Sequence, residues 1–137
     1  MQNTLKSPAC FTGLGLHTGL AVRMVVHPAA ADHGIRFRRT DVADRDAFVP
    51  AMWDAVTPSR LCTVVENADG VSVSTIEHVM AALAGSAIHN ALIEIDGPEV
   101  PILDGSSLAF VTGFLAAGIE EQDAPIRAVR VLKAVEV

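Results

Sequence analysis

Residues 71–95 read VSVSTIEHVMAALAGSAIHNALIEI, and this stretch decides the fold class. Residues 71–73 are consistent with a short strand. Residues 74–77, STIE, match the capping box that opens an α-helix, and Gly85 is typical of a helix end. Residues 91–95 form a short apolar run that indicates another strand. The stretch therefore predicts a strand, a helix and a second strand in succession.

The sequence before this stretch is strand-rich. Residues 4–12 predict a first strand, which Pro8 makes an edge or irregular one. Residues 20–26 alternate in polarity as a half-buried strand does, and residues 34–40 indicate another. Residues 61–73 predict a hairpin around an Asp-Gly turn.

The sequence after this stretch adds a second helix over residues 107–117, which Gly118 ends. Residues 127–137 alternate again, which predicts a last strand. The order of elements favours an α+β fold, with a mainly antiparallel sheet and two helices on one face. Residues 1–126 would form the domain itself.

Composition limits the function classes. The 137 residues fit one domain, and 50% of them are apolar, with a mean hydropathy of +0.39, which excludes a disordered chain. The apolar excess implies an unusually complete core or a surface that another domain or chain covers. The net charge of −6 argues against a nucleic-acid partner. No apolar run is long enough to span a bilayer, so we expect no transmembrane segment.

The N-terminus lacks the apolar segment of a secretory signal. The two cysteines, Cys10 and Cys62, form no CxxC pair and give no disulfide framework. We therefore expect a reduced, cytoplasmic setting.

Three places concentrate reactive side chains. The first is residues 13–19, GLGLHTG, which indicates a loop whose backbone approaches a ligand near His17, or simply a hairpin turn with a surface histidine. The second is Glu77-His78, where a histidine nitrogen can bind zinc while a carboxylate takes a proton from water. Glu77 is equally explained as the capping-box acid.

The third place is residues 98–106, PEVPILDGS, in which Asp104 orients a catalytic group or serves a turn or helix cap. A catalytic zinc site needs at least three protein ligands. His78, His17, Cys62 and Asp104 are the available donors, but no pair has the local spacing of a zinc motif. Spacing alone therefore gives little support for a metal site.

Taken together, these motifs resemble one family, the zinc-dependent UDP-3-O-acyl-N-acetylglucosamine deacetylases of lipid A biosynthesis. Order and spacing agree over essentially the whole chain. The matching stretches are TGLGLHTG at 12–19, FRRTD at 37–41, LCT at 61–63, STIEH at 74–78 with AALAG at 81–85, and PEVPILDGS at 98–106.

The resemblance implies removal of the N-acetyl group from a UDP-sugar that carries a 3-O-hydroxyacyl chain, with one Zn²⁺ and a water. It implies that His78 is a zinc ligand, that Glu77 is the general base and that Asp104 is a polar support in the catalytic site. It places His17 near the substrate, with Leu61, Cys62 and Thr63 lining the site.

The resemblance also implies a fold of two similar α+β domains with the active site between them. Each domain carries a small β insert, which in this chain would be the hairpin at residues 61–73. This chain matches only the first domain, and residues 127–137 would be its last strand or the start of the link to the second domain. The family's other zinc ligands, a second His and an Asp from a His-Lys-x-x-Asp segment, belong to the second, as does the acid histidine. We therefore expect this chain to be the N-terminal half of the deacetylase and inactive alone. The alternative is a non-catalytic interaction module on the same scaffold, which pairs with another chain or with itself.

Overall fold

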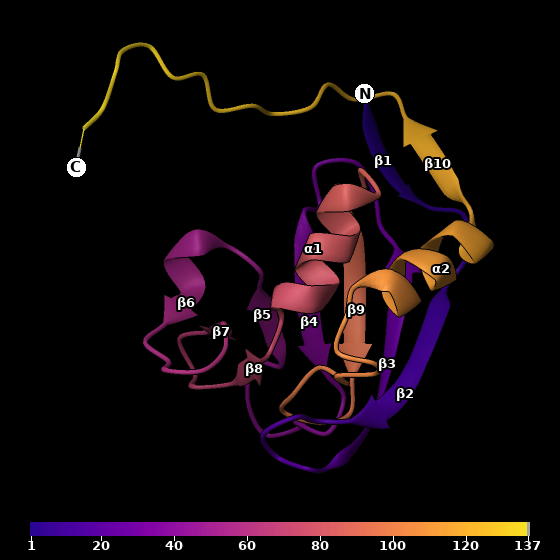
Figure 1. The fold of residues 1–137 in the computed structure, drawn as a ribbon, viewed down its shortest axis with the longest axis vertical. Coiled ribbons are helices and arrows are strands. Elements are labelled where there is room, and N and C mark those ends of the chain that lie inside the picture. Colours follow the sequence, from indigo (N-terminus) through magenta and orange to yellow (C-terminus); the bar gives the residue numbers. More distant parts are fainter. Residues whose placement is uncertain (137) are drawn as a thin grey trace.

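A five-stranded sheet forms the centre of the computed structural model, which describes residues 1–136. Its strand order is β2-β3-β9-β4-β5 (Figure 1). Three of its four strand pairings are antiparallel, and only the pairing of β4 with the central β9 is parallel. The strands are β2 (Ala9–Leu14), β3 (Ala21–Pro28), β9 (Ala91–Ile95), β4 (Ile35–Arg39) and β5 (Phe48–Pro50).

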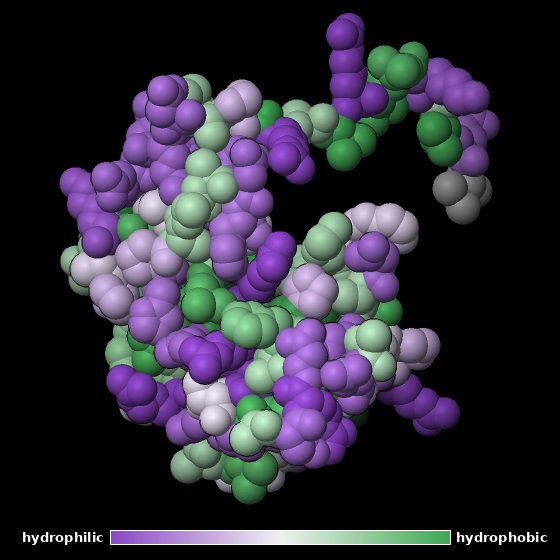
Figure 2. Space-filling view, turned by 180° about the vertical axis from the view of Figure 1, so that it is seen from behind, coloured by the Kyte–Doolittle hydropathy of each residue, from purple (hydrophilic) through white to green (hydrophobic). Residues whose placement is uncertain are grey.

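The two faces of this sheet differ because side chains alternate along each strand. On the outer face, Glu94 of β9 pairs with His27 of β3 at 3.1 Å and with Arg38 of β4 at 2.8 Å. Figure 2 views the molecule from behind and shows hydrophilic side chains interspersed with smaller hydrophobic areas. The inner face carries the apolar residues of each strand, which are buried. They include Met24, Val26, Phe37, Ile93 and Ile95.

Helices α1 (Glu77–Gly85) and α2 (Leu108–Ala117) lie on the same face of the sheet (Figure 1). Phe110 and Phe114 of α2 are fully buried, and both make edge-on contacts with Phe11 of β2, at ring-centre distances of 5.0 and 5.7 Å. Such aromatic packing adds stability beyond the area that it buries. The expected α+β class, with a mainly antiparallel sheet and two helices on one face, is confirmed.

A second, two-stranded sheet joins the ends of the domain. Strand β1 (Gln2–Leu5) pairs antiparallel with β10 (Ile119–Gln122). Asn90 beneath it is buried and donates from its amide to the side-chain oxygens of Gln2 and Gln122, both at 2.7 Å. These hydrogen bonds connect β1, at the start of the chain, to β10, the strand that follows α2.

A third sheet holds the insert. Strands β6 (Val56–Thr57), β7 (Val64–Glu66) and β8 (Ser72–Ser74) pair antiparallel, and a 3₁₀ turn, η1 (Trp53–Ala55), precedes them. The hairpin expected over residues 61–73 is present as β7 and β8. The Asn67 side-chain oxygen accepts from the Val71 N–H at 2.9 Å and closes its loop.

The structure corrects three sequence-based expectations. Residues 4–12 are not one strand, because the chain bends near Pro8 between β1 and β2. Residues 127–136 contain no strand, and this segment runs away from the domain (Figure 1) with exposed side chains; Val137 lies outside the described residues. No partner strand is available there to satisfy its backbone.

The third correction concerns the capping box. Ile76 is the N-cap residue of α1, and no side chain caps this end. The Ser74 hydroxyl donates instead to the Pro98 carbonyl at 3.1 Å, and Glu77 accepts from the Thr63 N–H at 3.0 Å. Tertiary partners therefore replace the local capping bonds. No helix within residues 1–136 is long and apolar enough to cross a membrane.

Candidate functional site

Glu77 begins helix α1, and its carboxylate turns toward the insert. Its Oε2 accepts a hydrogen bond from the Thr63 N–H at 3.0 Å, and both residues are half-buried. The bond joins the 61–63 segment to the start of the helix, two places that are 14 residues apart. Its other carboxylate oxygen has no hydrogen bond from the residues that the structure describes, which leaves an acceptor for a water or a substrate group.

His78 follows on the next helical position, about 100° around the axis from Glu77. Its side chain is half-buried, and its backbone carbonyl accepts from the Ser107 hydroxyl at 3.0 Å. That bond fixes the start of α2 against the first turn of α1. The segment that carries Asp104 therefore ends directly beside the residue proposed as a zinc ligand.

His17 lies at the tip of a tight turn after β2. The Gly19 N–H donates to the Gly15 carbonyl at 3.0 Å, and the Gly15 N–H donates to the Leu20 carbonyl at 2.9 Å. Gly19 takes a φ of +66°, a conformation that favours glycine. The His17 side chain is exposed at the end of this turn.

The backbone of the His17 turn is held by a buried carboxylate, that of Glu99. The N–H groups of His17 and Thr18 donate to it at 3.0 and 2.8 Å. The Thr75 hydroxyl donates to the same carboxylate at 2.8 Å, from the residue pair that precedes Glu77. Glu99 is only 1% exposed.

The pKa of Glu99 reflects two opposing effects. Burial disfavours the charged form and by itself raises the pKa, whereas the backbone N–H groups of His17 and Thr18 and the hydroxyls of Thr18 and Thr75 stabilise the carboxylate. The hydrogen bonds outweigh the effect of burial, and the pKa of Glu99 falls to about 2. The carboxylate is therefore ionised at neutral pH without a basic side chain beside it.

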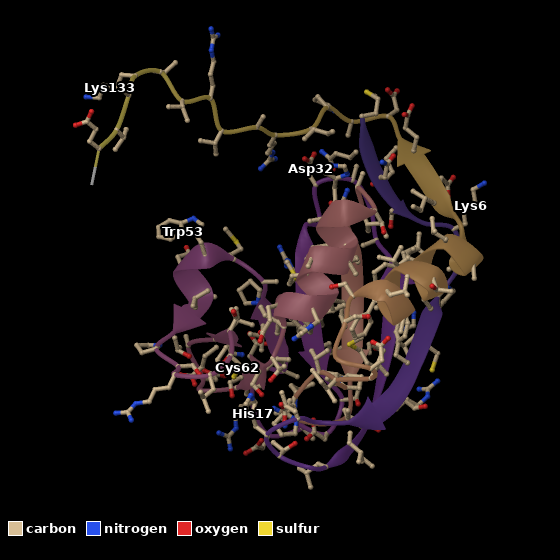
Figure 3. The ribbon with its side chains drawn as sticks, viewed as in Figure 1. Lys6, His17, Asp32, Trp53, Cys62 and Lys133 are labelled. Atoms are coloured by element: carbon tan, nitrogen blue, oxygen red, sulfur yellow. The ribbon has the colours of Figure 1, made fainter. Side chains whose placement is uncertain are left out.

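His17 also borders a pocket of about 280 Å³ that the insert completes. Figure 3 shows His17 and Cys62 in the same lower region of the molecule. Cys62 is half-buried and Leu61 is 80% exposed. The full lining is His17, Ser59, Arg60, Leu61 and Cys62. The structure thus brings three of the predicted substrate-binding residues together, while the fourth, Thr63, contacts Glu77.

Asp104 is exposed in the turn before α2. Its Oδ1 accepts from the Ser106 N–H at 3.0 Å and from the Ser106 hydroxyl at 2.9 Å, and these bonds lower the pKa of Asp104. This is the turn role that the sequence left open. Within residues 1–136 its carboxylate makes no hydrogen bond to Glu77, His78 or His17.

The donor set is suitable for zinc but incomplete. A neutral imidazole such as that of His78 is a common zinc ligand, and a catalytic site needs at least three protein ligands. In the part of the chain that the structure describes, no group of three or more His, Cys, Asp or Glu side chains could hold a metal ion. His78 could therefore contribute one ligand to a site whose other ligands come from elsewhere.

Sequence reasoning missed the buried contact between Glu99 and the His17 turn. In residues 98–106 the sequence pattern points only to Asp104. The available signal was chemical: a charged residue in an otherwise apolar stretch needs buried donors, and a glycine-rich turn has spare N–H groups.

The comparisons with known proteins identify the family of this chain. A sequence model of the UDP-3-O-acyl N-acetylglycosamine deacetylase family matches residues 2–137. A relative from Phenylobacterium zucineum, named UDP-3-O-acyl-N-acetylglucosamine deacetylase, is 53% identical over 136 residues, which are 99% of this chain and 46% of the relative.

Relatives of the same name from Actinobacillus succinogenes and Vibrio cholerae are 50% and 48% identical over 99% of this chain, and the match covers 44% of each. The chain spans about half the length of the curated relatives it matches. Because the family model covers nearly every residue, the chain belongs to the UDP-3-O-acyl N-acetylglycosamine deacetylase family.

Proposed function

We propose that this chain is the N-terminal half of a zinc-dependent deacetylase of lipid A biosynthesis. The substrate is UDP-3-O-(3-hydroxyacyl)-N-acetylglucosamine, whose N-acetyl group is hydrolysed to acetate and a free amine. The observation that carries the proposal is the start of α1. There the carboxylate of Glu77 lies next to a histidine in the sequence and accepts from the N–H of Thr63, the residue that directly follows the pocket-lining segment 59–62.

Glu77 is proposed as the general base. Its carboxylate accepts a proton from the water whose oxygen forms a bond to the acetyl carbon. The C–N bond then breaks, the nitrogen takes up a proton and acetate leaves. General-base catalysis of this kind contributes about 10²–10⁴-fold to rates. The Thr63 N–H fixes one carboxylate oxygen and leaves the other for the water.

His78 is proposed as the zinc ligand that this half supplies. When bound, zinc provides Lewis-acid polarisation of the acetyl carbonyl and a more acidic water. His17, Leu61 and Cys62 border the space in which we place part of the substrate. Asp104 is proposed as a polar support through the turn that leads to Ser107 and the His78 carbonyl.

The proposed partner is the second half of the enzyme. Exposed apolar side chains on α2 support the proposal that the second half covers this helix. Leu108 and Leu115 are 67% and 63% exposed, on a helix whose other face is in the core. We propose that residues 1–126 form the first domain and that residues 127–137 lead into the second. A cytoplasmic location is also proposed, and it agrees with two free thiols, Cys10 and Cys62.

A chimera tests the proposal. Residues 1–137 are joined to the part of the Phenylobacterium zucineum relative that they do not match, and acetate release from the UDP-sugar is measured. We expect turnover by the chimera and none by the 137-residue chain alone. Turnover by the isolated chain at the rate of the chimera would contradict the proposal.

Matched variants locate the chemistry. In the chimera, Glu77→Gln should lower kcat at least about 100-fold, whereas Glu66→Gln, at an exposed glutamate of β7, should leave it unchanged. His78→Ala should remove both activity and bound zinc, whereas His33→Ala should keep both. A Glu77→Gln chimera within twofold of the parent would refute the role of Glu77.

A further inference from the structure

Glu99 is the only charged side chain that is fully buried among residues 1–136, and none of the proposed chemical steps uses it. No basic side chain within residues 1–136 forms an ion pair with it. All its partners are neutral N–H and O–H groups, which come from the His17 turn and from Thr75. A buried charge is stable only when its surroundings are arranged to hydrogen-bond it, so these donors must stay in place.

Glu99 connects the three sequence motifs. Its own segment runs beside the end of β8, where the Ser74 N–H donates to the Pro98 carbonyl at 2.9 Å and the Val100 N–H donates to the Ser74 carbonyl at 3.1 Å. Its carboxylate reaches across to the His17 turn on one side and to Thr75 on the other.

Two backbone features are specific to the contact between Glu99, the His17 turn and Thr75. A side chain at Gly15 would collide with the Glu99 carboxylate and with the Thr18 hydroxyl, so the turn approaches Glu99 only because residue 15 is glycine. Thr75 has a φ of +57°, which a β-branched residue rarely adopts. Its hydroxyl bond to Glu99 helps to hold that conformation immediately before helix α1.

We infer that Glu99 is a positioning residue for the substrate pocket, because its carboxylate fixes the His17–Thr18 backbone against the Thr75 turn that begins the Glu77-His78 helix. Glu77 itself does not depend on Glu99, since the Thr63 N–H holds its carboxylate separately. The loss of the Glu99 charge therefore moves His17 and its side of the pocket, while the general base stays in place. This consequence for catalysis rests on the proposed function; the structural role does not.

The first test uses the ¹⁵N-labelled 137-residue chain and amide hydrogen exchange. Glu99→Gln keeps the shape of the side chain but replaces an oxygen acceptor by an NH₂ group that faces the same donors. We expect exchange at the His17 and Thr18 amides to be at least tenfold faster, with no change at the Val26 and Ile93 amides of the core. The control is Glu121→Gln, at an exposed glutamate of β10, which should change none of these amides.

The second test measures KM and kcat in the chimera described above. For Glu99→Gln we expect KM for the UDP-sugar to rise at least tenfold, with kcat within threefold of the parent. A merely structural role would lower kcat by reducing the folded fraction and would leave KM unchanged. Thr75→Val, which removes a single donor, should raise KM in the same direction by about threefold, and it replaces Glu99→Gln if that variant does not fold.

The outcomes separate the two hypotheses. Unchanged exchange at His17 and Thr18 in Glu99→Gln would overturn the structural role of Glu99, whether or not the chimera is active. Faster exchange with an unchanged KM, or a loss confined to kcat, would overturn its role in the pocket. A parent chimera with no turnover would count against the proposed function, and the exchange data would still decide whether Glu99 holds the turn.

Discussion

The stability of this domain should depend on pH through Glu99. The pKa of Glu99 is about 2 in the folded chain, against a usual value near 4.5. Because the folded value is the lower one, the folded state favours the ionised carboxylate. The stability that this provides is fully present above pH 4.5 and is lost as the pH falls through the folded pKa.

The size of the effect follows from the shift. A fall in pKa from 4.5 to about 2 corresponds to about 3 kcal/mol of folding free energy at pH 7. By pH 3 the unfolded chain is almost fully protonated at this position, and the contribution is only about 1 kcal/mol. Glu99→Gln cannot titrate, so the difference in stability between the two proteins should narrow by about 2 kcal/mol between pH 7 and pH 3.

Urea unfolding followed by circular dichroism measures this difference directly. The parent chain, Glu99→Gln and the control Glu121→Gln are unfolded at pH 7, 5.5, 4 and 3. Other carboxylates with lowered pKa values, such as Asp41 and Asp44, are present in all three proteins and cancel in the comparison. A gap between the parent and Glu99→Gln that stays constant with pH would refute the reasoning, because it would mean that the buried carboxylate is not selectively ionised in the folded state.

Three further predictions concern the scaffold and are also checked by urea unfolding. Gly15→Ala should destabilise the chain by about 1–3 kcal/mol, because the added methyl group collides with the buried Glu99 carboxylate. Gly85→Ala, whose methyl group meets nothing within 4 Å, should be neutral or stabilising. Equal effects of the two substitutions would argue against the close approach of Gly15 to Glu99. Phe110→Ala should lower the free energy of unfolding by about 3–5 kcal/mol and Leu115→Ala by less than about 0.5 kcal/mol, since only the Phe110 side chain is buried. Similar losses for the two variants would mean that the core lies elsewhere. Deletion of residues 128–137 should change stability by less than about 0.5 kcal/mol, and a larger loss would show that the segment packs on the domain.

Much of the fold was predictable because its patterns are local. The alternation in residues 20–26 and the Asp-Gly turn at 69–70 each depend on a few neighbouring residues, and both predictions are confirmed by β3 and by the β7–β8 hairpin. The strand predicted over 127–137 failed for residues 127–136, because alternation alone supplies no pairing partner. The short β10 was missed, since its pairing with β1 joins residues more than 100 positions apart.

The site was predictable only in part. Two contacts followed from the family resemblance: that of the 61–63 segment with Glu77, and that of His17 with the pocket that Leu61 and Cys62 line. No spacing rule joins positions so far apart in the sequence. The capping-box interpretation of residues 74–77 was wrong, since Ser74 and Glu77 both find tertiary partners. The contact between Glu99 and the His17 turn was not expected, because it joins positions 82 residues apart.

The zinc content of the purified proteins tests the central claim most directly. Metal analysis after dialysis compares the 137-residue chain, the chimera and the chimera with His78→Ala. If the chain supplies one ligand to a site completed by the second half, the chimera should retain about one zinc per molecule, and the isolated chain and the His78→Ala chimera should retain almost none. An isolated chain that keeps stoichiometric zinc would contradict the account, because it would mean that residues 1–137 already hold a complete site.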